Sequence, residues 1–299
     1  AMTDHLEYQP HEEDIPHPNR NRSFQVASEA AADHDLIVIN GSEITRDMPP
    51  GHSNAIFLEN ATALLKDDPM AVFREAEAQG AFAFWNHPMW TAQKPNGIPE
   101  LTDMHRQLID EGLLEGIEVV NYHTYSREAL RIALDHDLTI LGTSDIHGLV
   151  DWDFDVPSGG HRPVTLVFAK ERSKSGIESA LREGRTAAWF RNTLVGREAH
   201  LMPLLEASVS VAGASYQEET AVLDVAIANR SEAEFILDTR SEYPYHARAD
   251  VVRLAPHDTT TVQVKPGRRV ESLELRFGVL NAVVAPDEHP ELSLEVTPD

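Results

Sequence analysis

Five short clusters of histidine and acidic residues are the part of this sequence that could do chemistry. All but the first directly follow a short apolar run, which is typical of side chains at the end of a β-strand. Imidazole and carboxylate groups are ligands for divalent metals, and several of them close together could hold more than one ion. The clusters are Thr3-Asp4-His5, Gly41-Ser42-Glu43, Asn86-His87-Pro88, Tyr122-His123 and Ser144-Asp145-Ile146-His147.

The elements predicted around these clusters alternate between strand and helix up to about residue 190. Apolar runs predict the strands, while capping residues, glycine and proline mark the helix ends. This alternation is typical of a mostly parallel sheet or barrel, in which strand ends far apart in sequence meet on one rim. The predicted strands cover 36–40, 81–85, 116–120, 138–141 and 164–169, and the predicted helices, with their caps, cover 68–79, 101–111, 126–136 and 175–184.

The sequence after about residue 205 predicts a second domain of a different kind. Seven short strand candidates lie between 207 and 296, separated by turn residues, and helical periodicity is absent. Several candidates alternate apolar with polar residues, which is typical of an antiparallel β-sandwich of immunoglobulin-like type. We therefore predict an α/β barrel domain at 1–195 and a sandwich at 205–299 that serves packing or substrate positioning.

The composition excludes several classes of protein. The 299 residues include 49 acidic and 25 basic side chains, a formal net charge of -24, and no basic patch that a nucleic-acid polymer would require. The absence of cysteine excludes disulfides and zinc-thiolate sites. No apolar run approaches the roughly 18 residues of a membrane span, so we expect a soluble protein and no membrane partner. Compartment and oligomeric state stay open.

The predicted metal site offers oxygen and nitrogen donors and no sulfur. Such a donor set favours Mn²⁺, Zn²⁺ or Fe²⁺ over Ca²⁺ or Mg²⁺. Two ions about 3.5–4 Å apart need a bridging carboxylate, which we predict to be Glu43. Asp145 is the second carboxylate, expected on a single ion, and Asp4 is expected to orient an imidazole. We expect Pro88 to hold His87 in an extended backbone, and an extended 145–147 segment to point Asp145 and His147 the same way.

In this order, the clusters resemble the motifs of the PHP (polymerase and histidinol phosphatase) superfamily of metal-dependent phosphoesterases, over roughly residues 1–190. The resemblance implies a distorted (β/α)7 barrel with two or three divalent ions. With the C-terminal sandwich, the chain is similar to bacterial PHP proteins, some of which hydrolyse small phosphodiesters. The implied ligands are His5 and His147 on one ion, His87 and His123 on another, Glu43 as the bridge and Asp145 on the remaining ion.

The sequence departs from the family at its beginning. The family opens with a strand ending in His-x-His, and nothing before Thr3 supplies these residues. His11 and His17, in a proline-containing loop, are poor replacements. We therefore expect that the N-terminal part of the natural protein is missing from this sequence, and that a leader could have been lost with it.

The expected reaction is hydrolysis of a small phosphodiester by a metal-bridging hydroxide. The candidate catalytic residues are His52, Arg46 and the ligand His147. His52 would contact phosphate or protonate the leaving group, because its loop follows the Glu43 strand end. Arg46 would clamp a non-bridging oxygen, and the alternative is an ordinary surface arginine.

Three other functions stay open at the level of sequence. A phosphomonoesterase of histidinol-phosphatase type would favour more cationic residues near the metals than are visible. A non-catalytic binding protein on a decayed barrel is supported by the missing His-x-His. Amide or lactone hydrolysis by a related metal barrel usually needs a modified lysine, and none of Lys66, Lys94 and Lys170 is suitably placed.

Overall fold

A computed structural model of the chain describes residues 1–10, 18–246 and 250–299. The chain divides into two compact units, Ala1–Ala188 and Trp189–Asp299. His11 and His17 lie outside the described residues. No helix in the described ranges combines the length and the apolar character that crossing a membrane requires.

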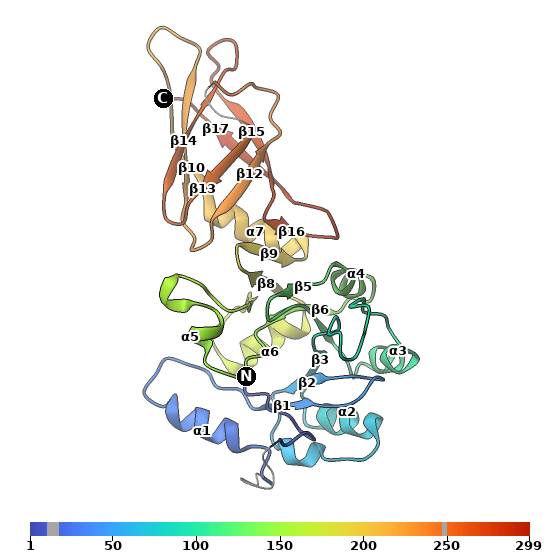
Figure 1. Ribbon diagram of the computed structural model, residues 1–299. Helices are drawn as coiled ribbons and strands as arrows, with labels where there is room; N and C mark the ends of the chain where they lie inside the picture. The colour runs from blue at the N-terminus through green and yellow to red at the C-terminus, as the bar shows by residue number, and fades with distance from the viewer. Residues whose placement is uncertain (11–17, 247–249) are drawn as a thin grey trace. The chain divides into compact units, whose positions relative to one another are not determined.

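A six-stranded mixed sheet forms the centre of the first unit (Figure 1). Three strands are parallel, in the order β3-β4-β6, and the β1–β2 hairpin continues the sheet from β3 in antiparallel fashion. The short strand β5 pairs antiparallel with β4. The strands of this sheet are β1 (Gly41–Ile44), β2 (Ser53–Ile56), β3 (Phe82–Trp85), β4 (Gly116–Asn121), β5 (Thr124–Tyr125) and β6 (Thr139–Thr143), followed along the chain by β7 (Val164–Val167) and β8 (Thr186–Phe190).

Helices pack against this sheet, and all of its strands except the short β5 are largely buried. Helix α2 (Pro69–Ala78) contacts β3, α4 (Arg127–Asp135) contacts β4 and β6, and α6 (Lys174–Arg182) contacts β3 and β7 (Figure 1). One core cluster joins Ile39, Phe82, Phe84, Leu141 and Leu181, all nearly inaccessible to solvent. The other helices of this unit are α1 (Arg22–Ala30), α3 (Asp103–Asp110) and α5 (Val150–Asp153), with the 3₁₀ helices η1 (Ala61–Leu64) and η2 (Val156–Ser158).

The ends of α2 follow directly from the sequence. The Asp68 carboxylate accepts a hydrogen bond from the Ala71 backbone N–H at 3.1 Å, and Pro69 takes the first helical position. The helix ends before Gly80, whose φ of +73° suits a residue without a side chain. The helix predicted over 68–79 is confirmed.

Some predicted boundaries are wrong. Residues 36–40 are not a strand: Leu36 is 67% exposed and only Asn40 forms a bridge, to Met2. The strand begins at Gly41, because its pairing with β2 starts at Gly41 opposite Ile56. Helix α6 is capped by Ser173 rather than Ser175, since the Ser173 hydroxyl accepts from the Gly176 N–H at 2.9 Å.

The second unit is rich in antiparallel strands with alternating burial, such as the exposed-buried alternation of β17 (Glu291–Val296). One sheet has the order β10-β11-β14 and the other β13-β12-β15-β17. These strands are β10 (Val209–Tyr216), β11 (Leu223–Asn229), β12 (Phe235–Thr239), β13 (Val251–Leu254), β14 (Thr259–Val264) and β15 (Leu273–Val279). Outside these two sheets, β9 (Thr193–Gly196) pairs in parallel with β16 (Ala282–Val283). Helix α7 (Glu198–Ser208) precedes β10 along the chain. The sequence did not predict α7, β9 or β13.

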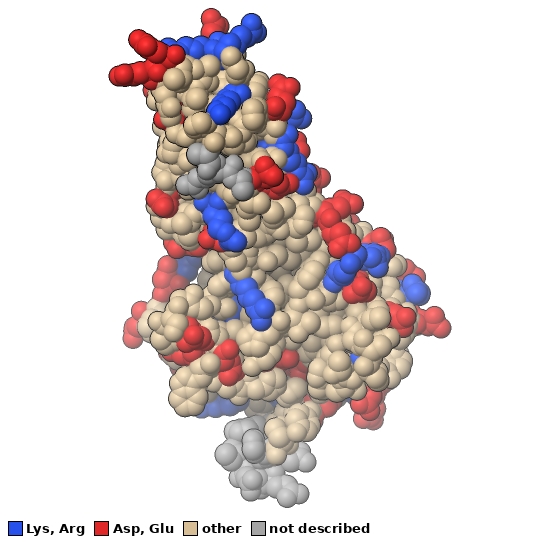
Figure 2. Space-filling view, turned by 45° about the horizontal axis from the view of Figure 1, so that its top comes forward, with Lys and Arg blue, Asp and Glu red and all other residues tan. Residues whose placement is uncertain are grey.

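The structure confirms a mixed α/β protein of two units, the second rich in β-strands. It does not establish a closed seven-stranded barrel, because β1 and β2 run antiparallel in the sheet. The distorted barrel therefore stays a prediction. On the face drawn in Figure 2, acidic and basic side chains are interspersed.

Buried His105 on α3 joins this helix to the loop that carries His52. Its Nε2 lies 2.6 Å from the Pro50 carbonyl oxygen, and its Nδ1 lies 3.2 Å from the Thr102 backbone nitrogen. A carbonyl only accepts, so Nε2 carries the proton and Nδ1 accepts, as in a neutral imidazole. The ring also packs on Trp85, with 4.0 Å between centroids. Burial is the main cause that lowers the pKa of His105 to about 4.

Because the pKa of His105 is lower in the folded chain than in the unfolded chain, we expect the free energy of unfolding to depend on pH. The unfolded chain takes up the His105 proton below its usual pKa of 6.5, while the folded chain resists until about 4. Neutral, buried His105 therefore contributes its full share to the free energy of unfolding above pH 6.5. This contribution is lost as the pH falls toward 4. At about 1.4 kcal/mol per pH unit, the loss amounts to roughly 3 kcal/mol. Urea unfolding of His105→Gln against wild type should show a stability difference that shrinks over this range. For exposed His34→Gln the difference should stay constant.

Candidate metal centre

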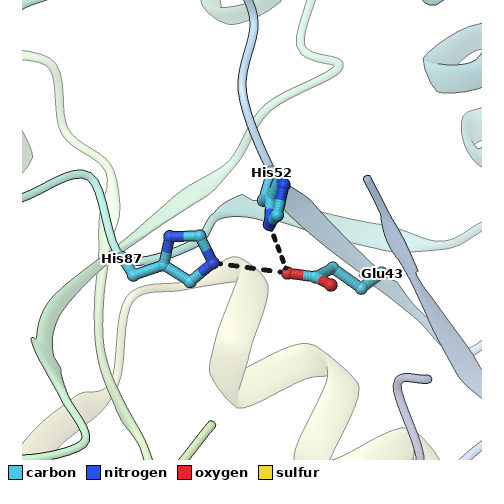
Figure 3. Close-up of side chains that lie close together, drawn as sticks. All are labelled: Glu43, His52 and His87. Atoms are coloured by element: carbon cyan, nitrogen blue, oxygen red, sulfur yellow. Dashed lines mark hydrogen bonds and ion pairs between the residues drawn. The ribbon is translucent and has the colours of Figure 1, made fainter. Parts of the chain in front are cut away.

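Three histidines, His5, His52 and His87, converge on the buried carboxylate of Glu43, and Figure 3 shows His52 and His87 directed toward it. The Oε1 atom of Glu43 lies 3.1 Å from His52 Nδ1 and 3.4 Å from His87 Nε2. The Oε2 atom forms an ion pair with His5 Nδ1. One carboxylate oxygen therefore faces His52 and His87, and the other faces His5.

The main chain of each segment explains why these side chains meet. The N-terminal residues run parallel to β1, with the Leu6 N–H bonded to the Glu43 carbonyl at 2.7 Å and the Glu43 N–H bonded to the Asp4 carbonyl at 2.9 Å. His52 lies at the end of the β1–β2 hairpin, just before the pairing of Ile44 with Ser53.

Asn86 ties these segments together at the end of β3. Its Nδ2 donates to Glu43 Oε1 at 3.1 Å, and its Oδ1 accepts from the Asn54 N–H at 3.0 Å. Its backbone N–H donates to the His52 carbonyl at 3.0 Å. Asn86 therefore fixes the carboxylate relative to both His52 and the adjacent His87.

The electrostatics follow from these contacts. Burial raises the pKa of Glu43, but hydrogen bonds from His5, His52 and His87 outweigh it, so the pKa lies well below its usual range. The bond to Glu43 is the main cause that raises the pKa of His5. Burial lowers the pKa of His87, yet Glu43, Glu118 and Asp145 raise it overall. The carboxylate is thus ionised, and it favours the protonated forms of His5 and His87.

The donor set fits a divalent cation. Glu43, His52 and His87 each offer a ligand atom, and these atoms lie within 4.8 Å of one another. The Nδ1 atom of His87 is buried and has no hydrogen-bond partner among the described residues. Imidazole nitrogen with carboxylate oxygen suits transition metals. Metal binding would displace protons from the imidazoles and so depend on pH.

Asp145 and His147 follow β6 and line the same cavity as His87. The cavity has a volume of about 610 Å³, and Trp90 and Tyr122 form part of its wall. The His147 ring centroid lies 5.7 Å from that of His5, and its Nδ1 lies 2.9 Å from the Asp145 carbonyl oxygen. The structure thus brings His147 beside His5, and Asp145 beside His87.

Two residues predicted for the site, His123 and Arg46, form no hydrogen bond or ion pair with Glu43 within the described part of the chain. His123 is exposed and packs against Tyr122 and Phe154, with ring centroids 4.1 Å and 5.1 Å away. It is not among the hydrogen-bond or ion-pair partners of Glu43 within the described ranges. The roles predicted for His123 stay predictions.

Arg46 is engaged by other groups. Its Nε donates to Glu7 Oε1 at 2.7 Å, its Nη1 to the Asp67 carbonyl at 3.0 Å, and its Nη2 to the Lys66 carbonyl. These contacts hold the 45–52 loop to its neighbours. A phosphate contact by Arg46 stays a prediction, and it would have to replace some of these bonds.

The backbone at two predicted ligands differs from expectation. His87 has a φ of +25° and Asp145 a φ of +46°, so neither is extended. Pro88 disfavours the helical region for His87 but does not exclude this left-handed turn, which the surrounding hydrogen bonds hold. Such strain at non-glycine residues clusters at functional sites.

From the sequence, His52 was expected to act in catalysis and not to bind metal, whereas in the structure it also offers a ligand atom within 4.8 Å of those of Glu43 and His87. The missing signal was β2, since a strand at Ser53–Ile56 paired with β1 places His52 beside Glu43. The role of Asn86 was also missed. Its position before His87 was visible, but its partners lie on two other segments, Glu43 on β1 and His52 and Asn54 at the start of β2.

The fold and the cluster define a two-unit α/β protein with a candidate metal centre in its first unit. A family model described as an Ig-like domain matches residues 209–295. No curated protein sequence matches the chain. The chain is similar to the crystal structure of a two-domain protein from Bacteroides vulgatus that contains a predicted PHP-like metal-dependent phosphoesterase. The TM-score is 0.90 and the identity 40%, over 99% of this chain and 85% of that one.

This likeness spans both units. The chain therefore belongs to the family of two-domain proteins with a predicted PHP-like metal-dependent phosphoesterase domain and an Ig-like domain. The resemblance noted from the histidine and acid clusters is confirmed.

Proposed function

We propose that this protein is a metal-dependent phosphoesterase that hydrolyses a small phosphodiester. The observation that carries the proposal is the position of Glu43, whose Oε2 faces His5 while its Oε1 faces His52 and His87. A carboxylate with one oxygen toward each of two imidazole groups is arranged as a bridge between two cations. The kinship with a predicted PHP-like phosphoesterase supports this reading.

The residues divide into two groups around this bridge. His5 and His147 would hold one ion and His87 another, with Asp145 contributing a carboxylate beside them. We retain His123 as a ligand on the strength of the family resemblance. Two or three ions of Mn²⁺, Zn²⁺ or Fe²⁺ suit this donor set. When bound, the ions supply Lewis-acid charge for phosphate and an activated water.

The chain's own side chains then orient the substrate. His52, with its side chain 12% exposed, lies between Glu43 and Trp90, where its imidazole can donate a proton to the leaving oxygen or to phosphate. Trp90 and Tyr122 border the cavity and would pack against the ester group. The non-phosphate part of the substrate would then occupy the cavity next to His87.

The charge of the cavity favours a diester over a monoester. Among the residues that the structure describes, the lining contains no Lys or Arg and includes Asp145, Glu128 and Asp153. A phosphomonoester carries one more negative charge than a diester near neutral pH, and basic side chains would be expected to meet it. The net charge of -24 likewise disfavours a nucleic-acid polymer.

An assay with two chromogenic substrates tests this proposal. The full-length protein, loaded with Mn²⁺, should hydrolyse bis-p-nitrophenyl phosphate faster than p-nitrophenyl phosphate, and EDTA should abolish the reaction. Activity on the monoester alone would contradict the diester assignment and favour a phosphomonoesterase. A protein that binds fewer than two metals per chain and hydrolyses neither substrate would instead be a binding protein.

A further inference from the structure

A second buried carboxylate, Glu118 on β4, lies behind the metal centre and has no role in the scheme above. Its side chain is almost completely inaccessible to solvent. Its Oε2 accepts from the His87 backbone N–H at 2.7 Å and from Asn121 Nδ2 at 2.9 Å. Its Oε1 accepts from the Thr143 hydroxyl at 2.6 Å. One carboxylate thus satisfies donors at the ends of three neighbouring strands.

These three strand ends carry the candidate ligands. His87 follows β3, Asn121 ends β4 just before Tyr122 and His123, and Thr143 ends β6 two residues before Asp145. At each end, a non-glycine residue then adopts a left-handed backbone. The three residues and their φ angles are His87 (+25°), Tyr122 (+50°) and Asp145 (+46°).

Left-handed backbone at such residues is unfavourable and persists only where neighbouring contacts impose it. The Glu118 contacts are short and buried, so they are suited to that task. Groups of this kind behind a ligand typically change metal affinity by about 10–100-fold when lost.

We propose that Glu118 is the positioning residue of the metal centre: through hydrogen bonds to His87, Asn121 and Thr143 it sets the three strand ends in register for metal binding. This inference rests on the proposed metal-dependent function. Glu118 touches neither substrate nor metal in this scheme, and its effect passes through the backbone of the ligands.

Thr143 allows a test that avoids the removal of a buried charge. Thr143→Val keeps the shape and removes one donor to Glu118, while Thr143→Ser keeps the hydroxyl. The matched control is Thr139→Val at the opposite end of β6, where the Thr139 hydroxyl donates to the Leu181 carbonyl at 2.7 Å, away from the ligands. Mn²⁺ affinity is measured by titration of the full-length protein, and thermal stability is measured separately in EDTA.

We expect Thr143→Val to weaken Mn²⁺ binding by about 10–100-fold, and Thr143→Ser to restore it. Thr139→Val should lower the melting temperature in EDTA and leave Mn²⁺ affinity unchanged. Glu118→Gln should keep near wild-type affinity, because its amide oxygen can accept from His87 and Asn121 while its NH₂ donates to Thr143.

Three results would overturn the inference. Unchanged Mn²⁺ affinity in Thr143→Val would show that Glu118 does not position the ligands. An equal loss of Mn²⁺ affinity in Thr143→Val and Thr139→Val would show that the effect comes from a general loss of stability. A loss in Glu118→Gln as large as in Thr143→Val would assign the effect to negative charge. If the wild-type protein itself bound no Mn²⁺, the proposed function would fail together with this inference, whereas the first three results leave that function standing.

Discussion

Replacing Glu43 by glutamine should abolish the binding of more than one metal ion and, with it, phosphodiester hydrolysis. The two carboxylate oxygens face His5 on one side and His52 with His87 on the other, so both are used. An amide offers one oxygen and one NH₂ group, and the NH₂ cannot ligate a cation. We expect a loss of affinity beyond the roughly 10–100-fold typical of residues that only support a ligand.

Metal content by elemental analysis and the bis-p-nitrophenyl phosphate assay measure this effect, and circular dichroism checks the fold. Glu111→Gln is the matched control, because Glu111 is exposed and pairs with Arg74 Nη2 at 3.0 Å on the surface. Full activity or full metal content in Glu43→Gln would show that the bridge is assigned to the wrong residue.

Replacing His87 by asparagine should have the next largest effect, a loss of about one metal per chain with nearly complete loss of hydrolysis. His87 Nε2 lies 3.4 Å from Glu43 Oε1, and its Nδ1 is buried without a hydrogen-bond partner in the described part of the chain. Asparagine is too short to place a donor atom where the imidazole reaches. The backbone N–H to Glu118 is retained, so the loss is confined to the side chain.

The control for this variant is His257→Asn in the second unit, where His257 Nε2 pairs with Glu232 Oε1 at 3.0 Å on an exposed surface. It should keep the wild-type metal content and rate. Metal-to-protein ratios of His87→Asn equal to those of wild type would remove His87 from the ligand set. The remaining imidazole candidates would then be the histidines at 5, 52, 123 and 147.

Much of the local structure could be predicted because its causes are local. The strand over 116–120 and the helix over 126–136 correspond to β4 and α4, since apolar runs and the Ser126 cap act within a few residues. The alternating strands after residue 205 likewise marked the β-rich unit. Boundaries failed where pairing decided them, as at Leu36, which is apolar but exposed.

The sequence by itself determined which residue types could bind metal and that most of them follow strands. It identified Glu43 and His87, because acids and imidazoles directly after apolar runs are a local pattern. Only the tertiary structure decided which imidazoles meet the carboxylate. His52 reaches Glu43 through the β1–β2 pairing. Glu118 joins the end of its own strand to the ends of β3 and β6 by hydrogen bonds that span 31 and 25 residues. Periodicity reports burial along one segment, whereas such contacts depend on which segments pair and in what register.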